Sequence, residues 1–152
     1  MDLAALLPVL TPRAVEWAET QAHVVLAHGA TLSPLGRNLA ASVGVREPDK
    51  IRLGVVTSLP LPDDALLRAA AVQTGLLGPK MIGLTLGYAV LVVTGHDADP
   101  RLLSHEFRHV YQYEAAGSIG AFLPRYLAEI VQFGYSGAPS ELDARSHEYS
   151  GA

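Results

Sequence analysis

The sequence contains no cysteine. Disulfide bonds and thiolate metal sites are therefore excluded, and any metal ion must be held by histidine and carboxylate ligands. Charged residues make up only 17% of the 152 residues, with 11 basic and 15 acidic side chains and a net charge of −4. This balance offers no basic surface for nucleic acid or for an anionic membrane, so we expect neither as a partner.

Long hydrophobic runs are also missing. The most apolar segment, Met81–Val93, contains two glycines and falls short of the roughly 20 residues that a membrane-spanning helix needs. No basic residue precedes Arg13, whereas a secretory signal begins with positive charge. Together with the lack of cysteine, these absences lead us to expect a cytoplasmic protein.

The composition is that of a packed globular chain. Hydrophobic residues make up 49% of it, a share typical of folded rather than disordered sequences. A length of 152 residues fits one domain, so we expect a single domain over residues 1–152. Residues 1–80 should supply the N-terminal helices and the first strand. Residues 81–152 should supply the remaining strand and the helices that carry the candidate site.

Caps, breaks and hydrophobic periodicity predict the individual elements. Helices are expected over residues 11–28, 33–43, 63–74, 99–116, 123–133 and from 139 onward, and strands over 50–57 and 82–93. The second strand segment forms either one long strand or a tight hairpin that turns at Gly87-Tyr88. This order predicts an α+β fold in which a small sheet packs on helices and the helical C-terminal half carries the site.

The most informative stretch is His105-Glu106-Phe107-Arg108-His109, which has the form H-E-x-x-H. It lies one to two turns inside the helix predicted over residues 99–116. Residues four apart share one helix face, so His105 and His109 can direct both imidazoles at one metal ion. Glu106 is then close enough to act as general base on a water that the metal activates. This is the arrangement of zinc metallopeptidases.

A catalytic zinc site commonly has three protein ligands, so a third ligand is expected downstream. The last predicted helix offers Glu141, Asp143, His147 and Glu148. Glu141 is favoured because it follows a Pro-Ser helix start at a plausible distance from His109. Asp143 and His147 remain alternatives, and Glu148 lies nearer the end of the helix. An acidic residue in a first turn also complements the helix dipole without any metal, so the choice stays open.

These residues resemble the gluzincin branch of the zincin metallopeptidases, in which the third ligand is a Glu on the helix after the motif helix. The likeness is carried by Leu103–Gln112, by Tyr126-Leu127 and by Glu141–Ala144, and it is closest to small bacterial minimal gluzincin-like domains. It covers about residues 85–148, and the first 80 residues add nothing to it. The resemblance implies Zn²⁺ as the cofactor, although another divalent ion also suits His and Glu ligands.

The sequence departs from the thermolysin-like pattern around the ligand Glu. Ser140 stands where that pattern has Asn, and Ala144 and Arg145 stand where it has Ser and Asp. The acidic residue that would orient a ligand histidine is therefore not evident, and Asp143 or Glu129 is a guess for this role.

Peptide hydrolysis also needs a donor for the developing oxyanion. Tyr126, Tyr135 and Arg145 are candidates, although packing explains the tyrosines and a surface ion pair explains the arginine without any such role. The resemblance implies that the strand over residues 88–93 forms the rim of the cleft and pairs with a peptide substrate. The alternative is an ordinary interior strand.

We therefore expect a zinc-dependent metallopeptidase that acts on a peptide or protein substrate. One alternative is a metal-binding regulatory or accessory domain without catalysis, and another is a metal-free interaction domain. Only a short segment follows His109. The cleft is therefore either shallow or completed by a partner chain or by a second copy in a homo-oligomer.

Overall fold

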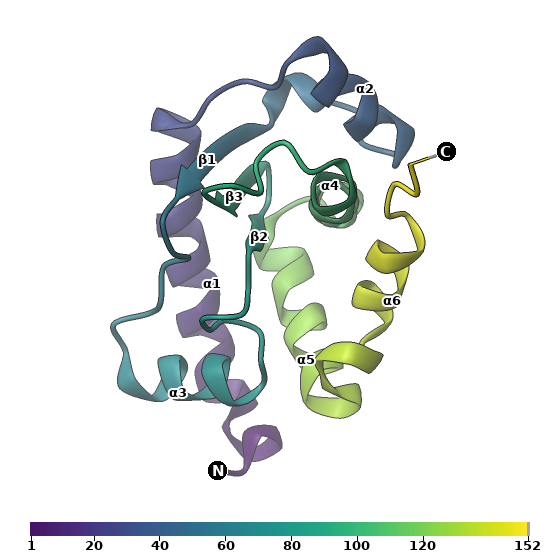
Figure 1. Cartoon of the computed structure of the whole chain (residues 1–152). Helices are drawn as coiled ribbons and strands as arrows, with labels where there is room; N and C mark the ends of the chain where they lie inside the picture. The colour runs from purple at the N-terminus through teal and green to yellow at the C-terminus, as the bar shows by residue number, and fades with distance from the viewer. Residues whose placement is uncertain (152) are drawn as a thin grey trace.

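The computed structural model describes residues 1–151, which form an α+β fold with a small sheet packed on helices (Figure 1). This confirms the predicted fold class. The elements follow the order α1 (Leu3–His28), α2 (Pro34–Ser42), the short 3₁₀ helix η1 (Pro48–Lys50), β1 (Arg52–Val56), α3 (Ala65–Gln73), β2 (Gly83–Leu86), β3 (Ala89–Val93), α4 (Pro100–Ala116), α5 (Ile119–Gly137) and α6 (Pro139–Ser146).

The sheet has the strand order β1-β3-β2. β1 pairs with β3 in parallel, whereas β2 and β3 are antiparallel and form a hairpin. Gly87 has a φ of 68° at the hairpin turn, a left-handed conformation that glycine adopts without steric strain. The tight hairpin is thus confirmed over the single long strand. The rim role for residues 88–93 is wrong, because β3 is the central strand and β2 lies at the edge beside α4.

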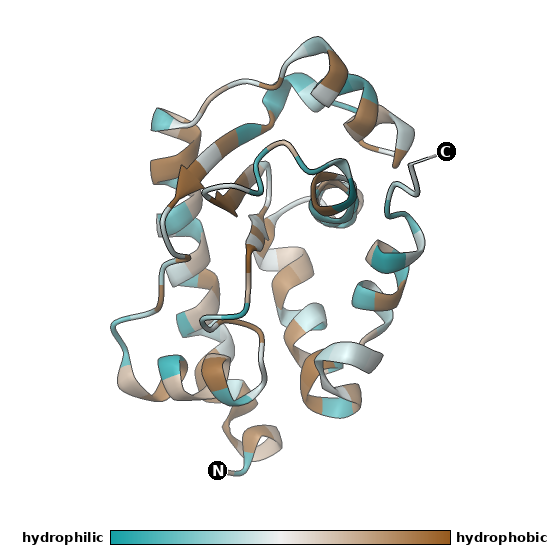
Figure 2. Cartoon of the chain, in the orientation of Figure 1, coloured by the Kyte–Doolittle hydropathy of each residue, from teal (hydrophilic) through white to brown (hydrophobic). Residues whose placement is uncertain are grey.

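The two faces of the sheet bury separate apolar clusters. Side chains alternate along a strand, so Ala89 and Leu91 pack toward α1 while Val90 and Val92 pack toward the side of α2 and α4. Figure 2 shows the strongly hydrophobic β3 between these layers. The sheet therefore fixes one face of α4 against the core and leaves other faces of that helix for polar contacts.

The helix that carries the motif matches its prediction closely. Asp99 caps its first turn by accepting a hydrogen bond from the backbone N–H of Arg101, and Pro100 occupies the first position. Gly117 ends it with a φ of 109°, and its N–H donates to the carbonyl of Tyr113. The H-E-x-x-H segment thus has helical geometry throughout.

Two other helices begin earlier than predicted. α1 starts at Leu3 rather than near Thr11, because Asp2 caps it and the hydroxyl of Thr11 donates within the helix to the carbonyl of Leu7. α5 starts at Ile119 rather than at Leu123, with Ser118 as its cap. In both cases a proline tolerated inside the helix resembles a start signal in the sequence.

Within residues 1–151, no helix combines the length and the hydropathy that a membrane crossing requires.

Candidate metal centre

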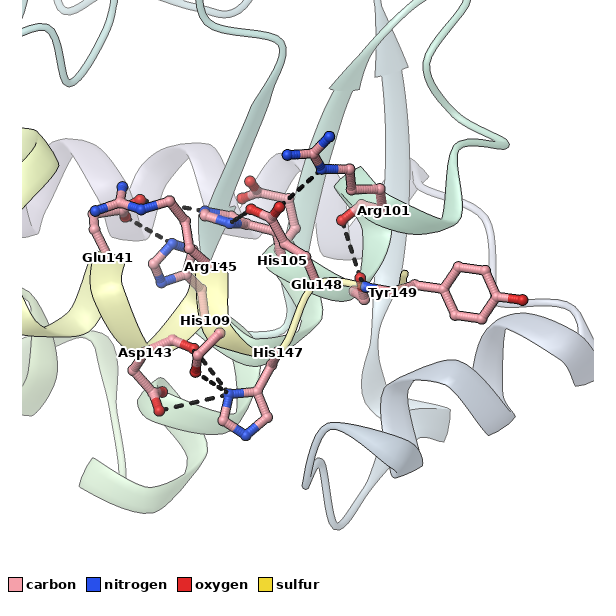
Figure 3. A network of polar contacts seen from close by, with 12 residues as sticks. Arg101, His105, His109, Glu141, Asp143, Arg145, His147, Glu148 and Tyr149 are labelled. Atoms are coloured by element: carbon pink, nitrogen blue, oxygen red, sulfur yellow. Dashed lines mark hydrogen bonds and ion pairs between the residues drawn. The ribbon is translucent and has the colours of Figure 1, made fainter. Parts of the chain in front are cut away.

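The structure brings together the three residues that the sequence favours as metal ligands (Figure 3). α4 presents His105 and His109 on one face, and the first turn of α6 presents Glu141. Their ligand atoms all lie within 4.8 Å of one another. Nε2 of His105 is 3.2 Å from Oε1 of Glu141, and Nε2 of His109 is 2.8 Å from its Oε2. Both imidazoles therefore face the same buried carboxylate.

The position of Glu141 depends on a contact between α5 and α6. The carboxylate of Glu129 on α5 accepts hydrogen bonds from the backbone N–H of Ser140 at 2.8 Å and from its hydroxyl at 3.1 Å. Ala138, at the N-cap position, has no polar side-chain atom that could accept these hydrogen bonds. Glu129 therefore holds the start of α6, and the guess that it orients a ligand histidine is wrong.

The orientation of His109 is fixed by a chain of polar side chains. Its Nδ1 lies 2.7 Å from Oε1 of Gln112, while Nε2 of Gln112 donates at 2.9 Å both to the carbonyl of Ser140 and to Oδ2 of Asp143. Both of these partners only accept, so the amide oxygen of Gln112 must face His109. Nδ1 of His109 is then the donor, and its Nε2 carries the lone pair toward Glu141.

Asp143 is itself held by Arg108, which donates to its two carboxylate oxygens at 2.8 and 3.2 Å. A bidentate pair of this kind fixes the carboxylate plane. The sequence suggested Asp143 as a possible ligand or as an orienting residue. In the structure it is not in the ligand cluster, and it reaches His109 only through Gln112.

A second chain orients His105. Its Nδ1 is 2.9 Å from Oε2 of Glu148, whose other oxygen accepts a hydrogen bond of 2.9 Å from Arg101 (Figure 3). A carboxylate accepts and does not donate when ionised, so Nδ1 of His105 is the donor, and in the neutral ring it is Nε2, facing Glu141, that carries the lone pair. Glu148 is the least favoured ligand candidate in the sequence, and in the structure it instead orients the candidate ligand His105.

The buried carboxylate of Glu141 shows that the cluster suits a cation. Its side chain is 1% exposed, and the hydroxyl of Tyr126 donates to Oε2 at 2.8 Å. Oε1 has no hydrogen-bond donor within the described residues. A buried acceptor left without a donor is costly. When both rings are neutral, two imidazole lone pairs and a carboxylate converge with no donor between them, and these are ligands that zinc and other divalent ions accept.

The electrostatics of the cluster agree with this interpretation. Burial lowers the pKa of His105, but the hydrogen bond that its protonated ring donates to Glu141 and the charges of Glu106 and Glu141 outweigh it and raise that pKa to about 9. Burial raises the pKa of Glu141, but its contacts with His105 and His109 outweigh this and hold it well below the usual range. The site thus attracts positive charge, which a proton or a metal ion can supply.

The remaining motif residue, Glu106, is buried beside the candidate ligands. Its Oε1 accepts a hydrogen bond of 2.8 Å from the hydroxyl of Thr85 on β2. A Cβ added at Gly83 would lie 2.9 Å from Oε2 of Glu106, so the carboxylate occupies the space that this glycine leaves free. The edge strand thus fixes the position of the candidate general base.

Of the remaining residues predicted for the site, two lie at the candidate metal centre and two lie outside it. Tyr126 contacts Glu141 directly, and Tyr135 lines the open cleft next to His105 and Glu106. Burial and then the charges of Glu141 and Glu106 raise the pKa of Tyr135. Arg145 instead donates to the carbonyl of Ser136, and His147 lies against the carbonyl of Asp143, outside the ligand cluster.

Sequence reasoning missed three residues that support the site. Gln112 lies one turn after His109, so its i, i+3 spacing was a usable signal. Glu148 was considered only as a ligand. Thr85 gave no signal, because its contact with Glu106 depends on how β2 packs on α4.

Comparisons of this chain with models of protein families, with curated proteins and with solved structures find no match. Any functional statement therefore depends on the residues described above.

Proposed function

We propose that this chain is a zinc-dependent metallopeptidase. The observation that carries the proposal is the convergence of His105, His109 and Glu141, with each imidazole held at Nδ1 so that Nε2 is free to ligate. Orienting acceptors at Nδ1 are typical of protein metal sites, where they fix the tautomer and the ring plane. His, His and Glu are ligands that zinc accepts, and other divalent ions also suit them.

When bound, zinc supplies Lewis acidity, which lowers the pKa of water and polarises a carbonyl. Glu106 then acts as general base: its carboxylate accepts the proton from the attacking water and delivers it to the leaving amine. The hydrogen bond from Thr85 to Oε1 leaves Oε2 as the oxygen available for this transfer. Tyr135 lines the same cleft as Glu106. In this proposal its hydroxyl donates to the developing oxyanion.

Substrate reaches these residues through an open cleft of about 380 Å³. One wall is the segment 80–83 that leads into β2, and the other contains His105 and Glu106 of α4. The cleft is small, which suits an extended segment of peptide better than a folded protein surface.

The alternative is a metal-binding regulatory or accessory domain without turnover. It is favoured by one observation: Glu106 is only 5% exposed and already accepts a hydrogen bond from Thr85. A carboxylate held in this way can serve structure rather than proton transfer.

Zinc content and peptide hydrolysis of Glu106→Gln separate the two functions. We expect near one zinc per chain in the wild type and in the variant, with hydrolysis of a peptide library lost only in the variant. The matched control is Glu19→Gln, at an exposed position on α1, which should keep both properties. Hydrolysis that survives Glu106→Gln contradicts the peptidase mechanism. Zinc without hydrolysis in the wild type supports the accessory domain.

A further inference from the structure

Two basic side chains line the open cleft beside the candidate metal centre. Arg101 lies in the first turn of α4, and Lys80 lies in the segment that leads into β2, so they belong to the two walls of the cleft. Lys80 is exposed and forms no ion pair within residues 1–151. The cleft therefore carries positive charge that neither the candidate ligands nor the candidate general base uses.

The guanidinium of Arg101 is held in one orientation. Its Nε donates at 2.9 Å to Oε1 of Glu148, whose other oxygen lies 2.9 Å from Nδ1 of His105. In Figure 3 the two terminal nitrogens of Arg101 make no contact with the residues drawn. A guanidinium presents its donors in a planar fork, so fixing Nε also fixes the direction of the terminal pair. The side chain is 76% exposed, so a ligand can reach these nitrogens.

The spacing along α4 sets how far a group bound by Arg101 lies from the metal ligands. Arg101 precedes His105 by four residues, a rise of about 6 Å along the helix. An extended peptide advances about 3.3 Å per residue. A group bound by Arg101 therefore belongs roughly one or two residues away from a carbonyl held at the candidate ligands.

We propose that Arg101 and Lys80 bind the free C-terminal carboxylate of a peptide substrate, so that one amino acid or a dipeptide is released from the end of the chain. The proposal rests on the metallopeptidase function proposed above. The terminal nitrogens of an arginine bind a carboxylate in bidentate fashion, and Lys80 adds a second positive charge from the opposite wall.

The acidic side chains at this end of the cleft already have donors. Asp99 accepts the backbone N–H of Arg101 as the cap of α4, and Glu148 accepts from the Nε of Arg101. The terminal nitrogens of Arg101 and the ammonium of Lys80 are therefore left for a ligand. A chain terminus also suits a cleft of about 380 Å³ better than a chain that continues past Arg101.

Peptide binding to zinc-loaded Glu106→Gln tests this, because that variant should bind substrates without cleaving them. The probes for calorimetry are acetyl-alanyl-alanine and its C-terminal amide. We expect the acid to bind roughly tenfold or more tightly than the amide, since hydrogen bonds to a charged group are the stronger ones. This preference should vanish when Arg101→Gln is added and shrink when Lys80→Gln is added. The C-terminal amide of acetyl-alanyl-aspartate, whose only carboxylate is in a side chain, should bind as weakly as the first amide.

Matched variants separate binding of the carboxylate from support of the metal centre. Arg46 is also 76% exposed and also pairs with a glutamate, but it does not line the cleft, so Arg46→Gln should keep the preference. Lys50→Gln is the corresponding control for Lys80. Because Arg101 also holds Glu148, zinc content is measured on every variant. If Arg101→Gln loses zinc, Lys80→Gln decides the result, since no contact joins Lys80 to the candidate ligands.

Three results would overturn the proposal. They are equal affinities for acid and amide, an equal gain for the aspartyl peptide, and a preference for the acid that survives Arg101→Gln and Lys80→Gln, which would place the carboxylate on the metal.

The same samples keep the two proposals distinguishable. Wild-type hydrolysis without preference for a free C-terminus refutes the carboxylate site and leaves the peptidase function standing. Preferential binding of the acid by a protein that cleaves no peptide refutes the peptidase and leaves the carboxylate site standing. In protein that takes up no zinc the comparison of acid and amide still decides, because Arg101 and Lys80 are not ligands.

Discussion

The contact between α1 and α5 is apolar, whereas the contact between α4 and the segment around α6 is polar. The first buries Ala14, Ala18 and Ala22 of α1 in one hydrophobic cluster with Phe122 and Ile130 of α5. The second is made largely of ion pairs and hydrogen bonds, and two chains of these lead to the candidate metal ligands.

The two contacts respond to different conditions. Apolar burial depends on the area removed from water and is insensitive to metal or to protonation. While His105 is neutral, Oε1 of Glu141 is buried without a donor, so the polar contact is completed by a proton on His105 or by a metal ion. A metal ion should therefore stabilise α6 against α4 and leave the α1 region unchanged.

The largest effect is expected when both motif histidines are removed. The double substitution His105→Ala/His109→Ala takes away two of the three proposed ligands, so near one zinc per chain should fall to none in metal analysis. Amide hydrogen exchange should show zinc protecting α6 in the wild type only. The exposed pair His23 and His28 on α1 gives the control, His23→Ala/His28→Ala, which should bind zinc normally. Full zinc content in the motif double variant would contradict the assigned ligands.

A substitution at Leu91 tests the apolar region around α1. This residue of β3 is 5% exposed and packs in the cluster with α1. Leu91→Ala should lower the free energy of unfolding by about 2–5 kcal/mol, as measured by urea denaturation, because it leaves a cavity in a packed core. Zinc affinity of the folded fraction should not change. A selective loss of zinc affinity would show that the two regions are coupled.

Local signals explain why the motif helix was predictable. Asp99, Pro100 and Gly117 define its ends in the sequence, and the i, i+4 spacing of the histidines needs only helical geometry. Glu141 was favoured because the start of its helix was also visible in Pro139. The ligand positions therefore followed from elements whose limits are set by neighbouring residues.

The supporting residues could not be predicted in the same way. Glu148 reaches His105 only because the chain after α6 returns along α4, which depends on tertiary packing. The early start of α1 has a similar cause: Leu3 and Leu6 pack against the hydrophobic cluster, and this burial extends the helix past two prolines. In both cases contacts distant in sequence outweigh the local signal.

The variant Gln112→Leu tests whether zinc affinity depends on how His109 is oriented, since the histidine itself is kept. Gln112→Leu keeps the size of the side chain but removes the acceptor at Nδ1 of His109. Zinc affinity should fall by roughly 10- to 100-fold in competition with a chelator, as for other orienting partners. Gln132→Leu, at an exposed position of α5, should leave the affinity unchanged. An unchanged affinity in Gln112→Leu would show that α4 alone orients the imidazole.

The smallest effect is expected at Glu114, which forms a polar network outside the ligand cluster. Its carboxylate accepts hydrogen bonds from the backbone N–H groups of Arg46 and Glu47 at 2.7 and 3.0 Å and from the hydroxyl of Tyr88 at 2.7 Å. Burial raises the pKa of Glu114, but the N–H of Arg46 and the hydroxyl of Tyr88 outweigh it, so the pKa is lowered overall.

A lowered pKa in the folded state sets the sign of the pH dependence. The stabilisation from Glu114 is complete above the unfolded pKa of 4.5 and is lost as pH falls through the folded value. Glu114→Gln should therefore lower the free energy of unfolding by about 1–2 kcal/mol at neutral pH, and the difference from wild type should shrink at about pH 3. Urea denaturation at both pH values measures this, and zinc affinity at neutral pH should stay the same. Glu114 lies on the same helix as the two candidate ligand histidines. A loss of zinc affinity in Glu114→Gln would therefore show that the polar network around Glu114 is coupled to the candidate metal centre.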